Sequence, residues 1–79
     1  MIVNATYHGA GSGLPLPAEN GQMVTAILPA GCVLRVATDH ENFASAGPTP
    51  ILHAGPRASY RIDCISYGGS PVTATLSVG

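Results

Sequence analysis

The residues of this chain that are best suited to chemistry are three histidines, two cysteines and four carboxylates. Together they include the ligand types that bind zinc. However, no histidine lies two or four positions from another, and Cys32 and Cys64 do not have the Cys-x-x-Cys spacing of zinc sites. We therefore predict no metal site and no bound cofactor. We interpret Asp39, His40, Glu41 and Asn42 as the polar start of a loop in which the aspartate caps the backbone.

A hydrolase triad can be assembled on paper, but no motif marks it. Two residues are candidates for each of its three positions: Ser12 or Ser45, His40 or His53, and Asp39 or Asp63. Neither serine lies in a nucleophile elbow, and a domain of this size offers little room for a pocket that excludes water. We predict that the chain has no catalytic residues and is not an enzyme.

A glycine-rich segment, residues 9–13, follows a predicted strand, as a phosphate-binding loop would. Such a loop must open a helix whose N-terminus holds the phosphate. The next residues are Leu14, Pro15, Leu16 and Pro17, which cannot start a helix. The segment is therefore interpreted as a surface loop and not as a nucleotide site.

Charged residues make up only 9% of the 79 residues, and the chain contains no lysine. Globular domains usually carry about a quarter charged residues, so we expect a partner to cover much of this surface. With Arg35, Arg57 and Arg61 as the only basic residues besides histidine, the chain lacks the basic patch that nucleic-acid binding requires. No apolar run approaches the ~18 residues of a membrane-spanning helix, which argues against a membrane protein.

The first residues of the chain lack the basic region and the long apolar stretch of a signal peptide, so we expect a protein that is not exported. In a cytosol, Cys32 and Cys64 would stay reduced, and their apolar neighbours predict two buried thiols. A disulfide is the alternative. It would require the two cysteines to be neighbours, with Cα atoms about 5.5 Å apart.

Alternation of apolar and polar residues predicts one all-β domain over residues 1–79. The clearest case is residues 72–78, in which every second side chain is apolar and would face a core. We interpret residues 58–78 as a β-hairpin that turns at its Gly-Gly-Ser sequence, and residues 22–28 and 32–38 as a second hairpin. Shorter strands are expected at residues 2–7 and 51–53.

These elements predict a small antiparallel β-sandwich or partly open β-barrel of about six strands with almost no helix. Two long loops, residues 9–21 and 39–50, would project from it. The second hairpin has apolar residues on both faces, because Met23, Ile27 and Val33 fall opposite the side that would face the core. We expect a neighbouring sheet, a loop or a partner to cover that second face.

The long loops carry the apolar residues that we predict to contact a partner, Leu14, Leu16 and Phe43, with Arg35 or Arg61 at the rim of the contact. Apolar side chains on proline-stiffened loops lose little entropy when they dock. The alternative is that the three apolar side chains fold back as lids over the domain's own core.

The chain is short, all-β, almost chargeless, without a signal peptide, and rich in Ala, Gly, Thr and Pro. In this overall character it resembles the small decoration (cement) or accessory proteins of tailed-bacteriophage virions. The resemblance implies a non-enzymatic virion structural protein that is assembled in the host cytoplasm. It also implies a homo-oligomer, often a trimer, that binds the major capsid protein.

Two other classes of function stay open. A carbohydrate-binding or receptor-binding module would need an aromatic platform, and the chain offers only Tyr7, Tyr60 and Tyr67 and no tryptophan. A small metalloprotein or enzyme would need the histidine-containing sites that the spacing does not support.

Overall fold

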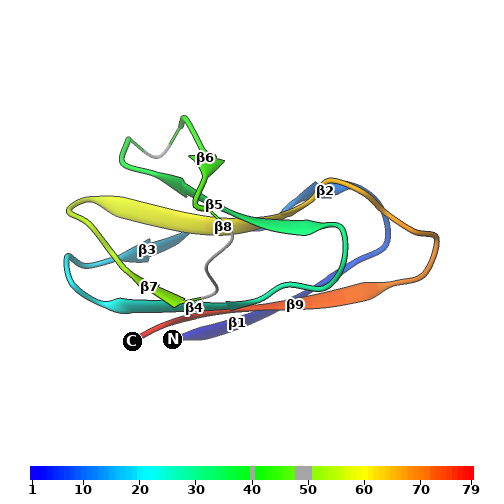
Figure 1. Ribbon diagram of the computed structural model, residues 1–79, viewed down its shortest axis with the longest axis horizontal. Helices are drawn as coiled ribbons and strands as arrows, with labels where there is room; N and C mark the ends of the chain where they lie inside the picture. Colours follow the sequence, from blue (N-terminus) through cyan, green and yellow to red (C-terminus); the bar gives the residue numbers. More distant parts are fainter. Residues whose placement is uncertain (40, 48–50) are drawn as a thin grey trace.

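The computed structural model describes residues 1–39, 41–47 and 51–79. Over these residues the chain forms two antiparallel β-sheets packed face to face, with no helix (Figure 1). The predicted all-β sandwich is confirmed. No strand pairing joins the two sheets within the described part of the chain, so the fold is a sandwich and not a closed barrel.

Among the described residues, sheet A has four strands and sheet B has five, of which four follow one another in a continuous order. Sheet A contains, in spatial order, β1 (Ile2–Tyr7), β9 (Val72–Val78), β4 (Met23–Ile27) and β7 (Ile51–His53). Sheet B contains β2 (Gly11–Ser12), β8 (Ala58–Cys64), β5 (Cys32–Ala37) and β6 (Ala44–Ser45). A further strand, β3 (Leu16–Ala18), pairs with β8 on the same side as β2. The longest strands, β8 and β9, both lie inside their sheets and are the last two in the chain.

The alternation of side chains decides which face of each sheet forms the core. On β9 every second residue from Ala74 to Val78 is buried, and the threonines and serine between them lie on the outer face, as the sequence predicts. The same alternation puts Leu34 of β5 and Ile62 of β8 in the core. The largest core side chains come from both sheets: Tyr7, Leu16, Val24, Leu34, Tyr60, Ile62, Leu76 and Val78.

Both predicted hairpins are wrong, because each pair of strands is split between the two sheets. β4 lies in sheet A and β5 in sheet B, and β8 and β9 are separated in the same way. Gly31 has the positive φ of 86° expected of a turn residue, but its carbonyl accepts hydrogen bonds from the backbone N–H groups of Ile65 and Ser66. The two connections therefore bind each other and carry the chain across the roughly 10 Å between stacked sheets.

The strand orders show a regular path of the chain between the sheets. Four connections cross between strands at equivalent positions: β1 to β2, β4 to β5, β6 to β7 and β8 to β9. This connectivity is that of a small jelly roll, in which two sheets are wound together. The three strands that the sequence did not predict, β2, β3 and β6, are short and lie within the two long loops.

Candidate functional site

The predicted rim residues Arg35 and Arg61 meet on the outer face of sheet B. They lie directly opposite each other on β5 and β8, where two like charges repel. Asp63, on the same face of β8, offsets this repulsion. One carboxylate oxygen, Oδ2, lies 2.8 Å from Nε of Arg35, and the other, Oδ1, lies 2.9 Å from Nε of Arg61.

Asp63 is largely shielded from water, with 7% of its surface exposed. Its contact with Arg61 through Oδ1 is an ion pair without in-line hydrogen-bond geometry, whereas Nη2 of Arg61 donates a hydrogen bond of 3.3 Å to Oδ2. The carboxylate is therefore occupied by two guanidinium groups. It is poorly placed to act as a general base or as the orienting acid of a triad.

Phe43 joins this group from the loop between β5 and β6. The guanidinium carbon of Arg61 lies 4.2 Å from the centroid of the Phe43 ring, which is a cation–π contact. Pairing of Arg35 with Ser45 and of Val36 with Ala44 holds this loop against sheet B. We call Arg35, Phe43, Arg61 and Asp63 the arginine cluster. It brings together three of the five residues predicted to bind a partner: both arginines bind Asp63, and Phe43 contacts Arg61.

The start of the same loop is organised by Asp39, as the sequence predicts. Oδ1 of Asp39 accepts hydrogen bonds from the backbone N–H groups of Asn42, at 2.8 Å, and Glu41, at 3.0 Å. These bonds, with that to Asn42 the strongest, favour the ionised carboxylate and lower the pKa of Asp39 to about 2. Asp39 therefore has a structural role. His40, and residues 48–50 of the predicted loop, lie outside the described residues.

The two leucines of the other loop have opposite environments. Leu14 is 83% exposed, so its side chain is available to a partner. Leu16 is only 7% exposed and pairs with Tyr60 through β3, so it belongs to the core. The lid alternative therefore describes Leu16, and the prediction that it contacts a partner is wrong because its side chain is buried. The flanking prolines hid the alternation of β3, in which Leu16 and Ala18 are buried and Pro17 is exposed.

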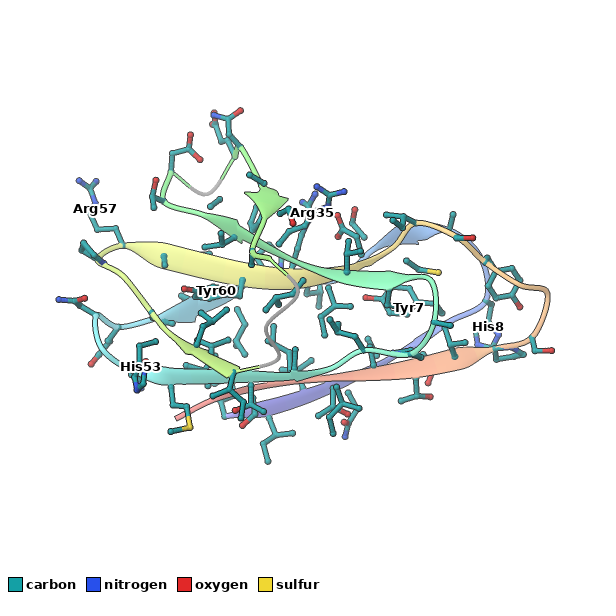
Figure 2. All side chains as sticks on the ribbon, in the orientation of Figure 1. Tyr7, His8, Arg35, His53, Arg57 and Tyr60 are labelled. Carbon is teal, nitrogen blue, oxygen red and sulfur yellow. The ribbon has the colours of Figure 1, made fainter. Side chains whose placement is uncertain are left out.

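The groups considered for metal binding and hydrolysis are dispersed. His8 and His53 are both exposed and lie at opposite ends of the sandwich (Figure 2). Among the residues that the structure describes, no group of three or more His, Cys, Asp or Glu side chains is arranged to hold a metal ion.

The glycine-rich segment has a packing role that the sequence did not reveal. A Cβ atom on Gly13 would lie 2.6 Å from the Tyr7 hydroxyl and 2.7 Å from the carbonyl oxygen of Ile62. Both Gly13 N–H and the Tyr7 hydroxyl donate hydrogen bonds to this carbonyl. Burial, the largest cause, raises the pKa of Tyr7 and keeps the hydroxyl protonated as a donor. Only glycine allows this approach of the loop to the core.

A second surface, the outer face of sheet A, was not predicted from the sequence. The outer face of sheet A carries no Asp, Glu, Lys or Arg side chain on any of its four strands. We call it the uncharged face; its members are Ile2, Asn4, Thr6, Met23, Thr25, Ile27, Ile51, His53, Thr73, Thr75 and Ser77. Polar residues fill its centre, and Ile2, Ile27 and Ile51, each more than half exposed, lie around them. The alternation of each strand was visible in the sequence, but the pairing that gathers the strands into one face was not.

Comparison with models of protein families, with curated proteins and with solved structures finds no significant match to this chain. Over the described residues, the structure contains no helix that is long and apolar enough to cross a membrane.

Proposed function

We propose that this chain is a non-enzymatic structural subunit of a virion, a decoration (cement) protein that self-associates and binds the major capsid protein. The observation that carries the proposal is the uncharged face. It spans all four strands of sheet A and presents side chains that a partner can cover without removing any formal charge from water.

The composition of this face suits a permanent contact. Burying an unpaired charge is costly, whereas threonine, serine and asparagine side chains can exchange water for partner hydrogen bonds at a small net cost. Ile2, Ile27 and Ile51 add apolar surface whose burial is favourable. The small charge of the whole chain, −1, gives a weak long-range field, so shape and hydrogen bonding would select the partner.

The arginine cluster indirectly supports the uncharged face as the surface that a partner covers. Arg35 and Arg61 are engaged with Asp63, and Phe43 is stacked on Arg61, so three of the residues first considered for docking have partners within the chain. Leu14 keeps its exposed side chain and remains a contact residue in this proposal. A glycan-binding function is less well supported, because Tyr7 and Tyr60 are buried and cannot stack on a sugar ring.

The proposal is tested by binding to tailed-phage capsids from which decoration proteins have been removed. The purified protein is mixed with these capsids and sedimented, and the bound fraction is measured. We expect saturable binding by the natural chain. Ile27→Lys places a charge on the uncharged face and should weaken binding at least tenfold, because that charge would be buried without a partner.

Ile65→Lys is a matched control. Ile65 is 57% exposed and Ile27 64% exposed, but Ile65 lies outside sheet A. The control should bind as the natural chain does. Failure of the natural chain to bind any capsid, together with its absence from virions by immunogold labelling, would overturn the proposal. Equal losses of capsid binding in Ile27→Lys and Ile65→Lys would show that the uncharged face is not the docking surface.

A further inference from the structure

Strand β1 forms one edge of sheet A and, among the described residues, pairs only with β9. It is six residues long, has the sequence Ile-Val-Asn-Ala-Thr-Tyr, and contains no charge and no proline. Exposed edge strands are usually protected from other chains by charge, proline, a bulge or short length. Of these devices, β1 has none. The opposite edge of sheet A, β7, is protected by its length of three residues.

The hydrogen-bond pattern shows which backbone groups of β1 point outward. Met1 and Val78 exchange both of their backbone hydrogen bonds across the pair. In an antiparallel ladder such pairs alternate, so Val3, Ala5 and Tyr7 also direct their N–H and C=O groups toward β9. The N–H and C=O groups of Ile2, Asn4 and Thr6 therefore point away from the sheet. They form a regular row of unpaired donors and acceptors.

The side of the sandwich next to this row is open and mostly apolar. A hollow there is lined by Val3, Ala5, Leu14 and Ile62, with Leu14 almost fully exposed. A groove of about 380 Å³ is bordered by Met1, Leu16 and Val78, and also by Glu19 and Gln22. A partner that extended sheet A past β1 would cover the mouths of both, so backbone pairing and apolar burial would act together.

We propose that β1 pairs with β1 of a second copy of this chain, antiparallel and around a twofold axis at Asn4. In this register Asn4 of each copy lies opposite Asn4 of the other, and Ile2 of each lies opposite Thr6 of the other. These are the three outward-pointing residues, so each opposite pair exchanges two backbone hydrogen bonds. The two copies would share one continuous eight-stranded sheet.

The side chains of β1 fit a second copy. On the inner face, Val3 of each copy meets Ala5 of the other in pairs without hydrogen bonds, where side chains approach most closely. On the outer face, Oδ1 of Asn4 already accepts a hydrogen bond of 2.7 Å from Thr75, which leaves the Asn4 amide N–H groups for the other copy. Every cross-strand pair is neutral, so no like charges meet.

In this pairing, β1 is the surface through which the chain self-associates. The inference rests on the proposed function only for the expectation that the chain self-associates. It leaves the uncharged face free, because strands added at an edge do not cover a sheet's face. Docking to a capsid and pairing through β1 are therefore separate properties and can fail separately.

The test compares Asn4→Pro with Asn4→Ala by sedimentation equilibrium. Proline removes an N–H group that points away from the sheet and is tolerated on edge strands, so the monomer should fold, as circular dichroism and melting temperature will show. We expect the natural chain and Asn4→Ala to be dimers, and Asn4→Pro to dissociate at concentrations at least tenfold higher. Alanine keeps the backbone donor and is the matched control.

A cross-link keeps the test decisive if the proline variant does not fold. In Asn4→Cys the two new cysteines would have Cα atoms about 5.5 Å apart, within disulfide range. Oxidised glutathione should then link them, with the two thiols oxidised and glutathione reduced to two thiols. Thr73→Cys, exposed on the neighbouring strand, should not cross-link, because its two copies lie several strands apart.

A natural chain that is monomeric at millimolar concentration would overturn both this pairing and self-association. A natural chain that oligomerises while Asn4→Pro oligomerises equally and Asn4→Cys does not cross-link would overturn the pairing alone. A trimer would also exclude it, because a twofold pairing of β1 closes at two copies.

Discussion

Cys32 on β5 lies directly opposite Cys64 on β8, and both side chains are buried in the core. The next pair of the ladder, Gly31 and Ile65, is hydrogen-bonded from Ile65 N–H to Gly31 C=O. Because hydrogen-bonded and non-hydrogen-bonded pairs alternate along an antiparallel ladder, Cys32 and Cys64 form a pair without backbone hydrogen bonds. Such Cα atoms are about 4.5 Å apart, near the lower limit for a disulfide. The cysteines are therefore neighbours, as the disulfide alternative required, and both are free thiols in the structure.

We predict that these thiols react slowly in the folded protein. Burial, followed by the effect of Cys64, raises the pKa of Cys32, so less of the reactive thiolate is present at neutral pH. Intact mass spectrometry after treatment with iodoacetamide, without reductant, should show no modification of the folded chain and two added groups after denaturation. Absence of modification even in denaturant would show a disulfide and contradict the prediction.

We predict that Asp63→Asn destabilises the fold by about 1.5–3 kcal/mol, the range for hydrogen bonds to charged groups. The change leaves Arg35 and Arg61 opposite each other without a counter-charge. Urea unfolding measures the loss. Glu19→Gln removes an exposed carboxylate with no ion pair among the described residues and should be neutral. Equal stability of the two variants would show that Asp63 does not offset the repulsion.

For Phe43→Ala we expect the monomer to lose about 0.5–1 kcal/mol, the usual size of a partly exposed cation–π contact. The measurement is thermal or urea unfolding at a concentration at which the chain is monomeric. The same variant tests the first interpretation of Phe43 as a contact residue. If association weakens by more than a few tenths of a kcal/mol while monomer stability is unchanged, Phe43 binds a partner and the contact with Arg61 contributes little.

Gly31→Ala should be the most destabilising alanine substitution among the loop glycines. A Cβ atom there would lie 2.0 Å from the carbonyl oxygen of Ser66, and the φ of 86° is itself unfavourable for alanine. Gly21→Ala isolates the second effect, because Gly21 has a φ of 87° and nothing within 4 Å of the added atom. We expect about 1–2 kcal/mol for Gly21→Ala and a further 1–3 kcal/mol for Gly31→Ala in unfolding experiments. Similar losses in both would show that the loop carrying Ser66 moves away freely.

The sequence predicted the strands well because alternation is a local property. Residues 72–78 identify their buried face without knowledge of any neighbour, and the same holds for Arg61 and Asp63, which had to share a face. Pairing between strands is not local. The turn at Gly31 has hairpin chemistry, but its hydrogen-bond partners come from residues 65 and 66, so the chain crosses to the other sheet.

The candidate surfaces were predictable to the same degree. Leu14 is exposed and its predicted partner contact stays a prediction, whereas Leu16 lies in the core because β3 pairs with β8, a contact distant in sequence. The arginine cluster needed the register of β5 on β8, and the uncharged face needed the order of four strands. Neither can be derived from composition, although the scarcity of charge indicated that some face would be free of it.

The position of β8 and β9 at the centres of their sheets determines when this chain can fold during synthesis. Until residues 58–78 have left the ribosome, β1 has no strand to pair with, β4 has only the short β7, and β5 has only the short β6. Until then the earlier strands lack their long pairing partners, because only the short pairs β4–β7 and β5–β6 can form without β8 and β9. Folding of this domain is therefore expected to wait for β8 and β9 and to be slow for its size, since every long pairing joins residues far apart in sequence.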